Sequence, residues 1–496
     1  MKNELEYIKP EQQGLDSKYI LNFIKRLQER KINIHSFMII RKNKVLAEAY
    51  YKPFDKEYMH RMYSVSKTFV ALAIGLLYTE KRIDLSEKLV DYFPDKVENT
   101  DDKWMQSCTI EDALKMALPI TSTTYADLKY DDWVWTCFNR EKSIKPSGTI
   151  FLYNTSATFL LCAIIEKITG LTFLEYLREI FDKIGVSKDI WCVKSPDGYA
   201  WGGSGVLCTM RDLAKVGLFV LRKGEWDGEQ LIARNYMEKM ITKQISNTNN
   251  NLFSFRKTCG YGYQTWITDC GFCMTGLGSQ LVFGFPKKDF LFVCTADTQA
   301  VGDYIGDYLC DLVKYELYEK LEDKELPCVE TEHLQKVLSE LKADGAWGEK
   351  NSEFSEKVNG CRYLLKENVM GWEWFSLHFD GDNGILRFKN VRGEKQIPFL
   401  MNEFFQTKFP ETHYFDKQIG VEGNREFNCL SSGTWLEEKK FLLRIYITDT
   451  CLGSVFISLG FKDNEVGVDM QKIGEFFLDD YEGYAGGRCF VEESNE

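Results

Sequence analysis

The sequence predicts an α/β (α+β) domain followed by a smaller all-β domain. Helical and strand-like patterns alternate before residue 322, a charged and proline-punctuated segment follows at 322–330, and short alternating runs separated by turn residues fill the chain after Gly345. We therefore place the first domain at residues 1–322, a linker with a short helix at 323–344, and a β-rich barrel or sandwich at 345–496.

The elements of the first domain follow from the spacing of apolar residues. Two apolar runs joined by a polar turn around Lys42-Asn-Lys44 predict a β-hairpin over 35–50. The stretch 64–78 is apolar on nearly every face, which is typical of a buried helix. Further helices are expected at about 17–30, 110–116, 156–168, 210–221, 305–321 and 332–341. Strands are expected at 261–266, 280–285 and 290–295.

In the second domain, alternation predicts strands at 385–391, 441–448, 454–460 and 465–470. The run Asp380-Gly-Asp-Asn-Gly384 is similar to the start of a calcium loop, but Gly384 stands where an oxygen ligand belongs. We interpret it as a tight turn. The glycine-rich stretch 476–487 is expected to be an irregular surface loop.

The charge balance excludes some partners. With 62 Lys+Arg against 74 Asp+Glu, the net charge of −12 repels nucleic acid and anionic lipid, so neither is expected to bind. The first ten residues contain no apolar run, and the longest apolar stretch, Phe69–Leu77, is too short to span a bilayer. A soluble cytoplasmic protein is therefore the expectation.

Cysteine and histidine usage argues against disulfides and metals. Fifteen scattered cysteines, an odd number, suit buried thiols better than a disulfide framework, and Cys270-Gly-Phe-Cys273 has no thioredoxin-like surroundings. Five histidines without an HExxH motif or paired CxxC motifs do not predict a zinc site. We expect neither a metal nor an organic cofactor.

Ser64-Val-Ser-Lys67 stands at the head of the predicted buried helix. A spacing of three residues places Ser64 and Lys67 on one helical face, within reach of each other. Unpaired N–H groups of the first turn can stabilise an oxyanion. A lysine beside an apolar helix is desolvated, which favours the neutral amine and suits a general base.

The Ser-x-x-Lys motif is weak evidence by itself, because it occurs twice more, at Ser254–Lys257 and Ser339–Lys342. Both of these lie in polar segments with no apolar helix behind them. We interpret both as solvated surface.

The context of Ser64 strengthens the catalytic interpretation. The segment 61–75 resembles the nucleophile helix of the serine β-lactamase and penicillin-binding-protein superfamily, most closely class C β-lactamases and their esterase relatives. Three further motifs follow in the family's order, and the resemblance covers about residues 10–320. The three motifs are Pro146-Ser-Gly-Thr-Ile-Phe-Leu-Tyr153-Asn-Thr-Ser, Gly202-Gly-Ser-Gly-Val-Leu-Cys-Thr-Met-Arg-Asp-Leu-Ala214 and Met274-Thr-Gly-Leu-Gly-Ser-Gln280.

The resemblance implies a β-lactamase-like fold, an antiparallel sheet flanked by helices plus an all-helical subdomain. It also implies roles for individual residues. Ser64 is the acylated nucleophile, Lys67 its proton acceptor and Tyr153 a second acid/base. The backbone N–H groups of Ser64 and Leu277 form the oxyanion hole, and the substrate-binding positions are Thr155, Met274, Thr275, Gly276 and Leu277.

Two positions depart from the family pattern. Thr155 stands where class C β-lactamases usually have asparagine, which weakens recognition of a substrate by a side-chain amide. Met274 replaces a lysine or histidine that would bind a β-lactam carboxylate, and methionine carries no charge. We therefore expect weak or absent β-lactamase activity and a small, uncharged ester or amide as substrate.

The sequence thus predicts a serine hydrolase that works through a covalent acyl-serine intermediate. A peptidase acting on D-amino-acid peptides has the same mechanism and differs only in its pocket. The alternative from another class is a regulatory or ligand-binding protein that retains the fold and no longer turns over. Met274 and Thr155 motivate this alternative, whereas the presence of both Ser64 and Lys67 argues against it.

Overall fold

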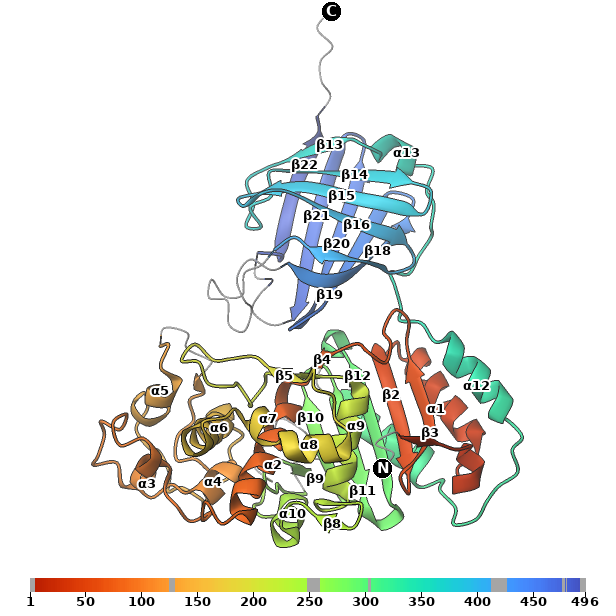
Figure 1. Cartoon of the computed structure of the whole chain (residues 1–496). Helices are drawn as coiled ribbons and strands as arrows, with labels where there is room; N and C mark the ends of the chain where they lie inside the picture. The colour runs from red at the N-terminus through yellow and green to blue at the C-terminus, as the bar shows by residue number, and fades with distance from the viewer. Residues whose placement is uncertain are drawn as a thin grey trace, which may run out of the picture. The chain divides into compact units, whose positions relative to one another are not determined.

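A computed structural model describes residues 5–124, 130–247, 259–301, 305–411, 426–474, 478 and 480–490. The chain forms two compact units, Met1–Lys342 and Ala343–Glu496 (Figure 1). Helix α12 (Thr331–Glu340), expected as part of the linker, packs on helix α1 (Ser17–Glu29) and strand β3 (Lys44–Tyr50), so it is part of the first unit.

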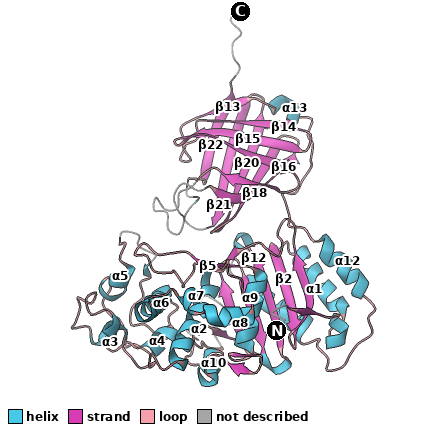
Figure 2. Cartoon of the chain, in the orientation of Figure 1, coloured by secondary structure: helices cyan, strands magenta, loops and turns pink. Residues whose placement is uncertain are grey.

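A seven-stranded sheet forms the centre of the first unit (magenta in Figure 2). Its order is β1-β3-β2-β12-β11-β10-β9, and all neighbours are antiparallel except β1 and β3. Besides β3, the strands are β1 (Glu6–Tyr7), β2 (Ile34–Arg41), β9 (Trp266–Ile267), β10 (Phe272–Gly276), β11 (Gln280–Phe285) and β12 (Phe290–Ala296). Every residue of β2, β11 and β12 is buried, so helices must cover both faces.

Helix α1 covers one face of this sheet. Its Phe23 ring meets Phe37 of β2 and Phe292 of β12 edge-on, with centroids 5.6 and 5.5 Å apart. Helix α9 (Met210–Leu221) covers the opposite face, where a Cβ added to Gly217 would come within 3.1 Å of the Leu291 side chain. Because side chains alternate along a strand, Leu291 and Phe292 point to opposite faces, one toward each helix.

The predicted hairpin is confirmed. Lys42 and Asn43 join β2 to β3 with φ of 48° and 62°. Two successive positive φ values are typical of the type I′ turn, whose twist matches that of the flanking strands.

The helical part of the first unit packs around α2 (Ser66–Thr79) and α6 (Thr155–Thr169). Eleven of the fourteen α2 residues are buried, as its apolar pattern predicts. The other helices here are α3 (Lys103–Gln106), α4 (Ile110–Leu114), α5 (Trp133–Asn139), α7 (Phe173–Tyr176), α8 (Arg178–Ile184) and α10 (Arg234–Met240). A small sheet has the order β4 (His60–Arg61), β6 (Val206–Cys208), β5 (Trp191–Cys192), and β7 (Glu225–Trp226) pairs with β8 (Glu229–Gln230).

The second unit is a barrel. Its sheet order is β16-β15-β14-β13-β22-β21-β20-β19-β18-β17, and a parallel pairing of β16 with β18 closes a ring of nine strands. Aromatic rings such as Phe399, Trp435 and Phe441 fill its core. Its elements are α13 (Ser355–Val358), β13 (Arg362–Leu365), β14 (Trp374–Asp380), β15 (Asn383–Asn390), β16 (Gly393–Met401), β17 (Phe405–Phe409), β18 (Phe427–Glu437), β19 (Lys440–Thr448), β20 (Leu452–Lys462), β21 (Glu465–Gly474) and β22 (Gly483–Cys489).

Three expected elements differ in the structure. The strand expected at 261–266 is wrong apart from its last residue, because Gly260 and Gln264 take φ of 111° and 52° and turn the chain. The helix expected at 305–321 is α11 (Ile305–Leu312) followed by a π-helical turn, Val313–Tyr318. The loop expected at 476–487 is wrong in its second half, where β22 pairs with β21 and β13.

Among the residues described above, no helix is both long enough and apolar enough to cross a bilayer.

Candidate active site

Ser64 lies in a tight 3₁₀ turn, Tyr63–Val65, directly before α2. The helix itself begins at Ser66, two residues later than expected, because Val65 N–H donates to the Met62 carbonyl and closes a shorter turn. Tyr63 has φ of 45°, a left-handed conformation that is costly for a residue with a side chain. Such conformations cluster at active sites, where the surrounding structure holds them.

Lys67 is the buried partner of this serine. Its side-chain nitrogen lies 3.1 Å from Ser64 Oγ, as the three-residue spacing predicts, although the lysine is only 1% exposed. Burial lowers the pKa of Lys67 from its usual 10.5 to about 7. In a large fraction of the molecules the Lys67 amine is therefore neutral near pH 7, and the neutral amine is the form that accepts a proton from a serine hydroxyl.

A backbone carbonyl makes the second contact with Lys67. The side-chain nitrogen donates to Gly203 O at 2.5 Å. A Cβ added at Gly203 would lie 2.3 Å from Cγ2 of Thr155, so a residue with a side chain does not fit without movement. The glycine-rich turn is visible in the sequence, but its carbonyl is not, because a backbone acceptor leaves no signal in residue type.

Tyr153 completes the group. The Lys67 nitrogen lies 5.0 Å from the centroid of the Tyr153 ring. That ring stacks on Trp266 with centroids 5.4 Å apart and meets the edge of Tyr261 at 6.4 Å. The structure thus brings Ser64, Lys67 and Tyr153 together. The aromatic wall behind Tyr153 is a feature that the motifs did not identify.

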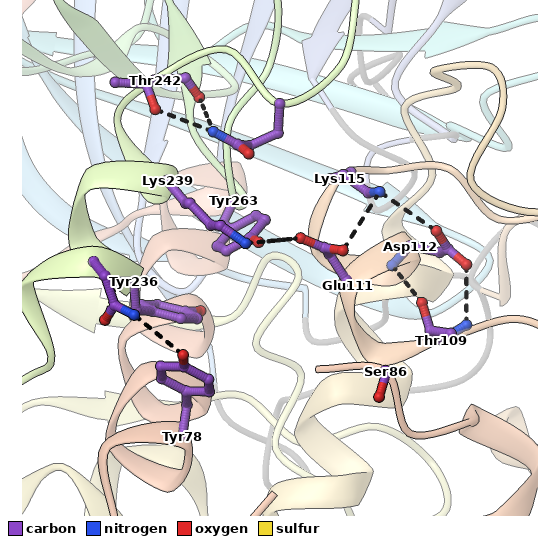
Figure 3. Close-up of polar contacts among 12 residues, drawn as sticks. Tyr78, Ser86, Thr109, Glu111, Asp112, Lys115, Tyr236, Lys239, Thr242 and Tyr263 are labelled. Carbon is purple, nitrogen blue, oxygen red and sulfur yellow. Dashed lines mark hydrogen bonds and ion pairs between the residues drawn. The ribbon is translucent and has the colours of Figure 1, made fainter. Parts of the chain in front are cut away.

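A polar cluster holds the segment that carries this wall (Figure 3). The Tyr263 hydroxyl donates to Glu111 at the start of α4, and Lys239 of α10 lies 3.4 Å from the same carboxylate. Gln264 donates to the α4 backbone at 2.8 Å. Segment 261–266 is therefore fixed to α4 and α10, which places Tyr261 and Trp266 against Tyr153.

The end of β10 lies against the turn that carries Ser64. A Cβ at Gly276 would come 2.2 Å from the Met62 carbonyl oxygen, so this position requires glycine for the close approach. Leu277 follows at the turn with a side chain 43% exposed. Its carbonyl accepts from Gln280 at 3.1 Å, which fixes the orientation of the peptide units that follow β10. This arrangement is compatible with the expected contribution of the Leu277 N–H to an oxyanion hole.

The other expected substrate-binding residues differ in exposure. Thr275 is partly exposed, whereas Met274 is 1% exposed within the sheet and Thr155 is 5% exposed, with its methyl group toward Gly203. Asn154, next to Thr155, is the N-cap of α6 and accepts from Ser156 N–H at 2.9 Å. Its side-chain amide thus stabilises the helix start.

The remaining Ser-x-x-Lys matches do not form a comparable pair. Ser339 and Lys342 are both exposed, and Ser339 donates to a backbone carbonyl one turn earlier. Ser254–Lys257 lies outside the described residues. Within the described ranges, no three His, Cys, Asp or Glu side chains gather closely enough to hold a metal ion.

Comparisons with known proteins give the family of the chain. The 6-aminohexanoate-dimer hydrolase of Paenarthrobacter ureafaciens is 25% identical over 254 residues, which cover 47% of this chain and 64% of that protein. The chain thus spans less than two thirds of the length of this relative. A structure titled "Putative 6-aminohexanoate-dimer hydrolase from Bacillus anthracis" has a TM-score of 0.50 and 23% identity, covering 60% of this chain and 82% of that one.

An octameric penicillin-binding protein homologue from Pyrococcus abyssi has a TM-score of 0.48 and 19% identity, covering 95% of this chain and 99% of that one. The family model described as Beta-lactamase matches residues 21–306, more than half of the sequence. The chain therefore belongs to the Beta-lactamase family.

Proposed function

We propose that this protein is a serine hydrolase that cleaves an uncharged ester or linear amide through an acyl-Ser64 intermediate. One observation carries the proposal: the buried amine of Lys67 lies 3.1 Å from Ser64 Oγ, and burial lowers its pKa to about 7. An ordinary surface lysine is charged at neutral pH and cannot take up the serine proton.

In the proposed reaction, Ser64 Oγ attacks the substrate carbonyl and its proton passes to Lys67. The N–H groups of Ser64 and Leu277 stabilise the oxyanion. The leaving alcohol or amine departs with a proton delivered by Lys67 or Tyr153. Water then attacks the acyl-serine, releases the carboxylic acid and restores the Ser64 hydroxyl. Each cycle consumes one ester or amide bond and one water molecule.

The charge of the site supports an uncharged substrate. Met274 supplies no cation at the position that binds a carboxylate in β-lactamases, and Phe151 extends the aromatic wall of Tyr261 and Trp266 at centroid distances of 5.1 and 5.7 Å. The named activity of the Paenarthrobacter ureafaciens relative is hydrolysis of a 6-aminohexanoate dimer. A linear amide is therefore a substrate to test beside simple esters.

The test is intact-protein mass spectrometry after incubation with a fluorophosphonate, combined with turnover of a p-nitrophenyl short-chain ester, a D-amino-acid peptide and a linear 6-aminohexanoate dimer. The amino and carboxyl ends of the dimer are blocked, because the free dimer carries a charge at each end. Ser64→Ala is the test variant. Ser339→Ala is the matched control, because it removes an exposed serine from the same motif. We expect labelling and turnover in the wild type and in Ser339→Ala, and neither in Ser64→Ala. Labelling without turnover of any ester, amide or D-peptide would favour the ligand-binding alternative, and absence of labelling would contradict the proposed nucleophile.

A further inference from the structure

We propose that Arg61 is a positioning residue that holds the nucleophile turn and the Gly203 turn together around Lys67. The inference rests on the proposed function, because it assigns Arg61 a role in the action of Lys67 as the base. It concerns a residue outside the Ser64, Lys67 and Tyr153 group.

Arg61 first fixes the turn that supplies the carbonyl for Lys67. Its Nε donates to Ser204 O at 2.9 Å, and a terminal nitrogen donates to Ser204 Oγ at 3.2 Å. Ser204 is bonded directly to Gly203, whose carbonyl accepts from Lys67. A planar guanidinium can make both Ser204 contacts at once, whereas a lysine ammonium lacks that fork geometry.

Arg61 also contacts the other side of the site. Its guanidinium carbon lies 4.7 Å from the ring centroid of Tyr63 and 5.1 Å from that of Trp201. Tyr63 is the left-handed residue directly before Ser64, and Trp201 lies in the same turn as Gly203. One side chain, 3% exposed, therefore contacts both segments that meet at Lys67.

Loss of the Arg61 contacts should raise the pKa of Lys67. Without Arg61, Ser204 O loses a charged donor and the space between the two rings opens to water. Hydration stabilises the charged amine, so the pKa of Lys67 rises from about 7 toward its usual value. The groups facing Lys67 are the Ser64 hydroxyl, the Tyr153 ring and the Cys162 thiol, and burial holds the pKa of that thiol well above its usual range. The Cys162 thiol is therefore neutral near pH 7 and supplies no charge that would compensate.

The experiment measures the rate of fluorophosphonate labelling of Ser64 from pH 5 to 10. The variants are Arg61→Lys and Arg61→Met, with Arg41→Lys as the matched control. Arg41 is equally buried and also donates to backbone carbonyls, Gln13 O at 2.5 Å and Glu322 O at 2.6 Å. Its loss therefore destabilises the same unit without touching the site. Circular dichroism and thermal unfolding report the folded fraction of each variant.

We expect the midpoint of the labelling profile to lie near pH 7 in the wild type and in Arg41→Lys, and about one pH unit higher in Arg61→Lys. Such a shift lowers the rate at pH 7 by about fivefold and leaves the rate near pH 9.5 almost unchanged. A purely structural role lowers the rate equally at every pH and leaves the midpoint in place. An unchanged midpoint in folded Arg61→Lys would overturn the proposal.

If neither Arg61 variant folds, Ser204→Ala decides the question, because it removes one of the acceptors of Arg61 and leaves the backbone in place. A midpoint several tenths of a pH unit above the wild type supports the proposal, and an unchanged one contradicts it. Failure of the proposed function looks different, since the wild type itself then shows no labelling of Ser64.

Discussion

The side-chain nitrogen of Lys67 lies 2.5 Å from the carbonyl oxygen of Gly203. This contact uses one N–H of the amine whether or not the side chain is charged. In the neutral form, the nitrogen retains a lone pair for Ser64 Oγ at 3.1 Å. The glycine-rich turn therefore does more than shape the backbone, because its carbonyl also orients the Lys67 amine, the proposed base, beside Ser64.

The first prediction concerns the pH dependence of the reaction of Ser64 with a fluorophosphonate. Because burial lowers the pKa of Lys67 to about 7, the rate at which Ser64 attacks a fluorophosphonate, with loss of fluoride, should rise through that pH and level off above it. Lys67→Ala should lower the plateau by 100-fold or more, in the range found when a general base is lost. Stopped labelling reactions analysed by mass spectrometry provide the rates. A wild-type profile without inflection between pH 6 and 8 would contradict this account.

A second prediction links the same lysine to stability. The folded state binds the Lys67 proton more weakly than the unfolded state, whose lysine titrates near 10.5, so the unfolded state holds more protons between pH 7 and 10.5. Stability therefore rises with pH across this window, by at most about 1.4 kcal/mol per pH unit.

Lys67→Met lacks this titration, so the wild type should gain stability relative to Lys67→Met as the pH increases from 7 to 10. Urea unfolding of both proteins at several pH values measures the difference. If the difference in free energy of unfolding between the two proteins did not change with pH, Lys67 would have its ordinary pKa in the folded protein.

The third prediction tests the fit between Gly203 and Thr155. Gly203→Ala places a methyl group against Cγ2 of Thr155, which should displace the Gly203 carbonyl and slow Ser64 acylation by about tenfold or more. Thr155→Ser removes that Cγ2, so the double variant should recover much of the lost rate. Acylation rates of the wild type, both single variants and the double variant form a complete double-mutant cycle. Additive losses in the double variant would contradict the steric explanation.

One part of this site could be predicted from local sequence, because Ser64 and Lys67 lie three residues apart along the chain. The three-residue spacing predicts that Lys67 reaches Ser64, and the apolar helix that follows predicts desolvation of the lysine. The hairpin at Lys42-Asn43 likewise depends on local turn chemistry. Each prediction used only neighbouring residues, and the structure confirms the geometry in both places.

The remaining features depend on contacts between distant segments. Gly203 O reaches Lys67 across 136 positions, and Trp266 stacks on Tyr153 from a segment that turns instead of extending as a strand. In the barrel, β22 has three glycines among seven residues, a composition that strand propensity disfavours. Pairing with β13 and β21 overrides that preference. No local pattern contains this information.

The last prediction separates the hydroxyl of Tyr153 from its ring. Tyr153→Phe keeps the stacking on Trp266, so the free energy of unfolding should change by less than about 1 kcal/mol while turnover falls by about 100-fold. Trp266→Leu retains the Tyr153 hydroxyl but removes the indole ring of Trp266, which is 3% exposed. Loss of this ring should lower the free energy of unfolding by about 2–4 kcal/mol.

Urea unfolding and ester turnover of the two variants, measured side by side, distinguish an acid/base from an aromatic packing residue. If Tyr153→Phe turned over at nearly the wild-type rate, Lys67 alone would have to carry the proton transfers. If Trp266→Leu instead lost turnover without losing stability, the wall would contact the substrate directly rather than positioning Tyr153.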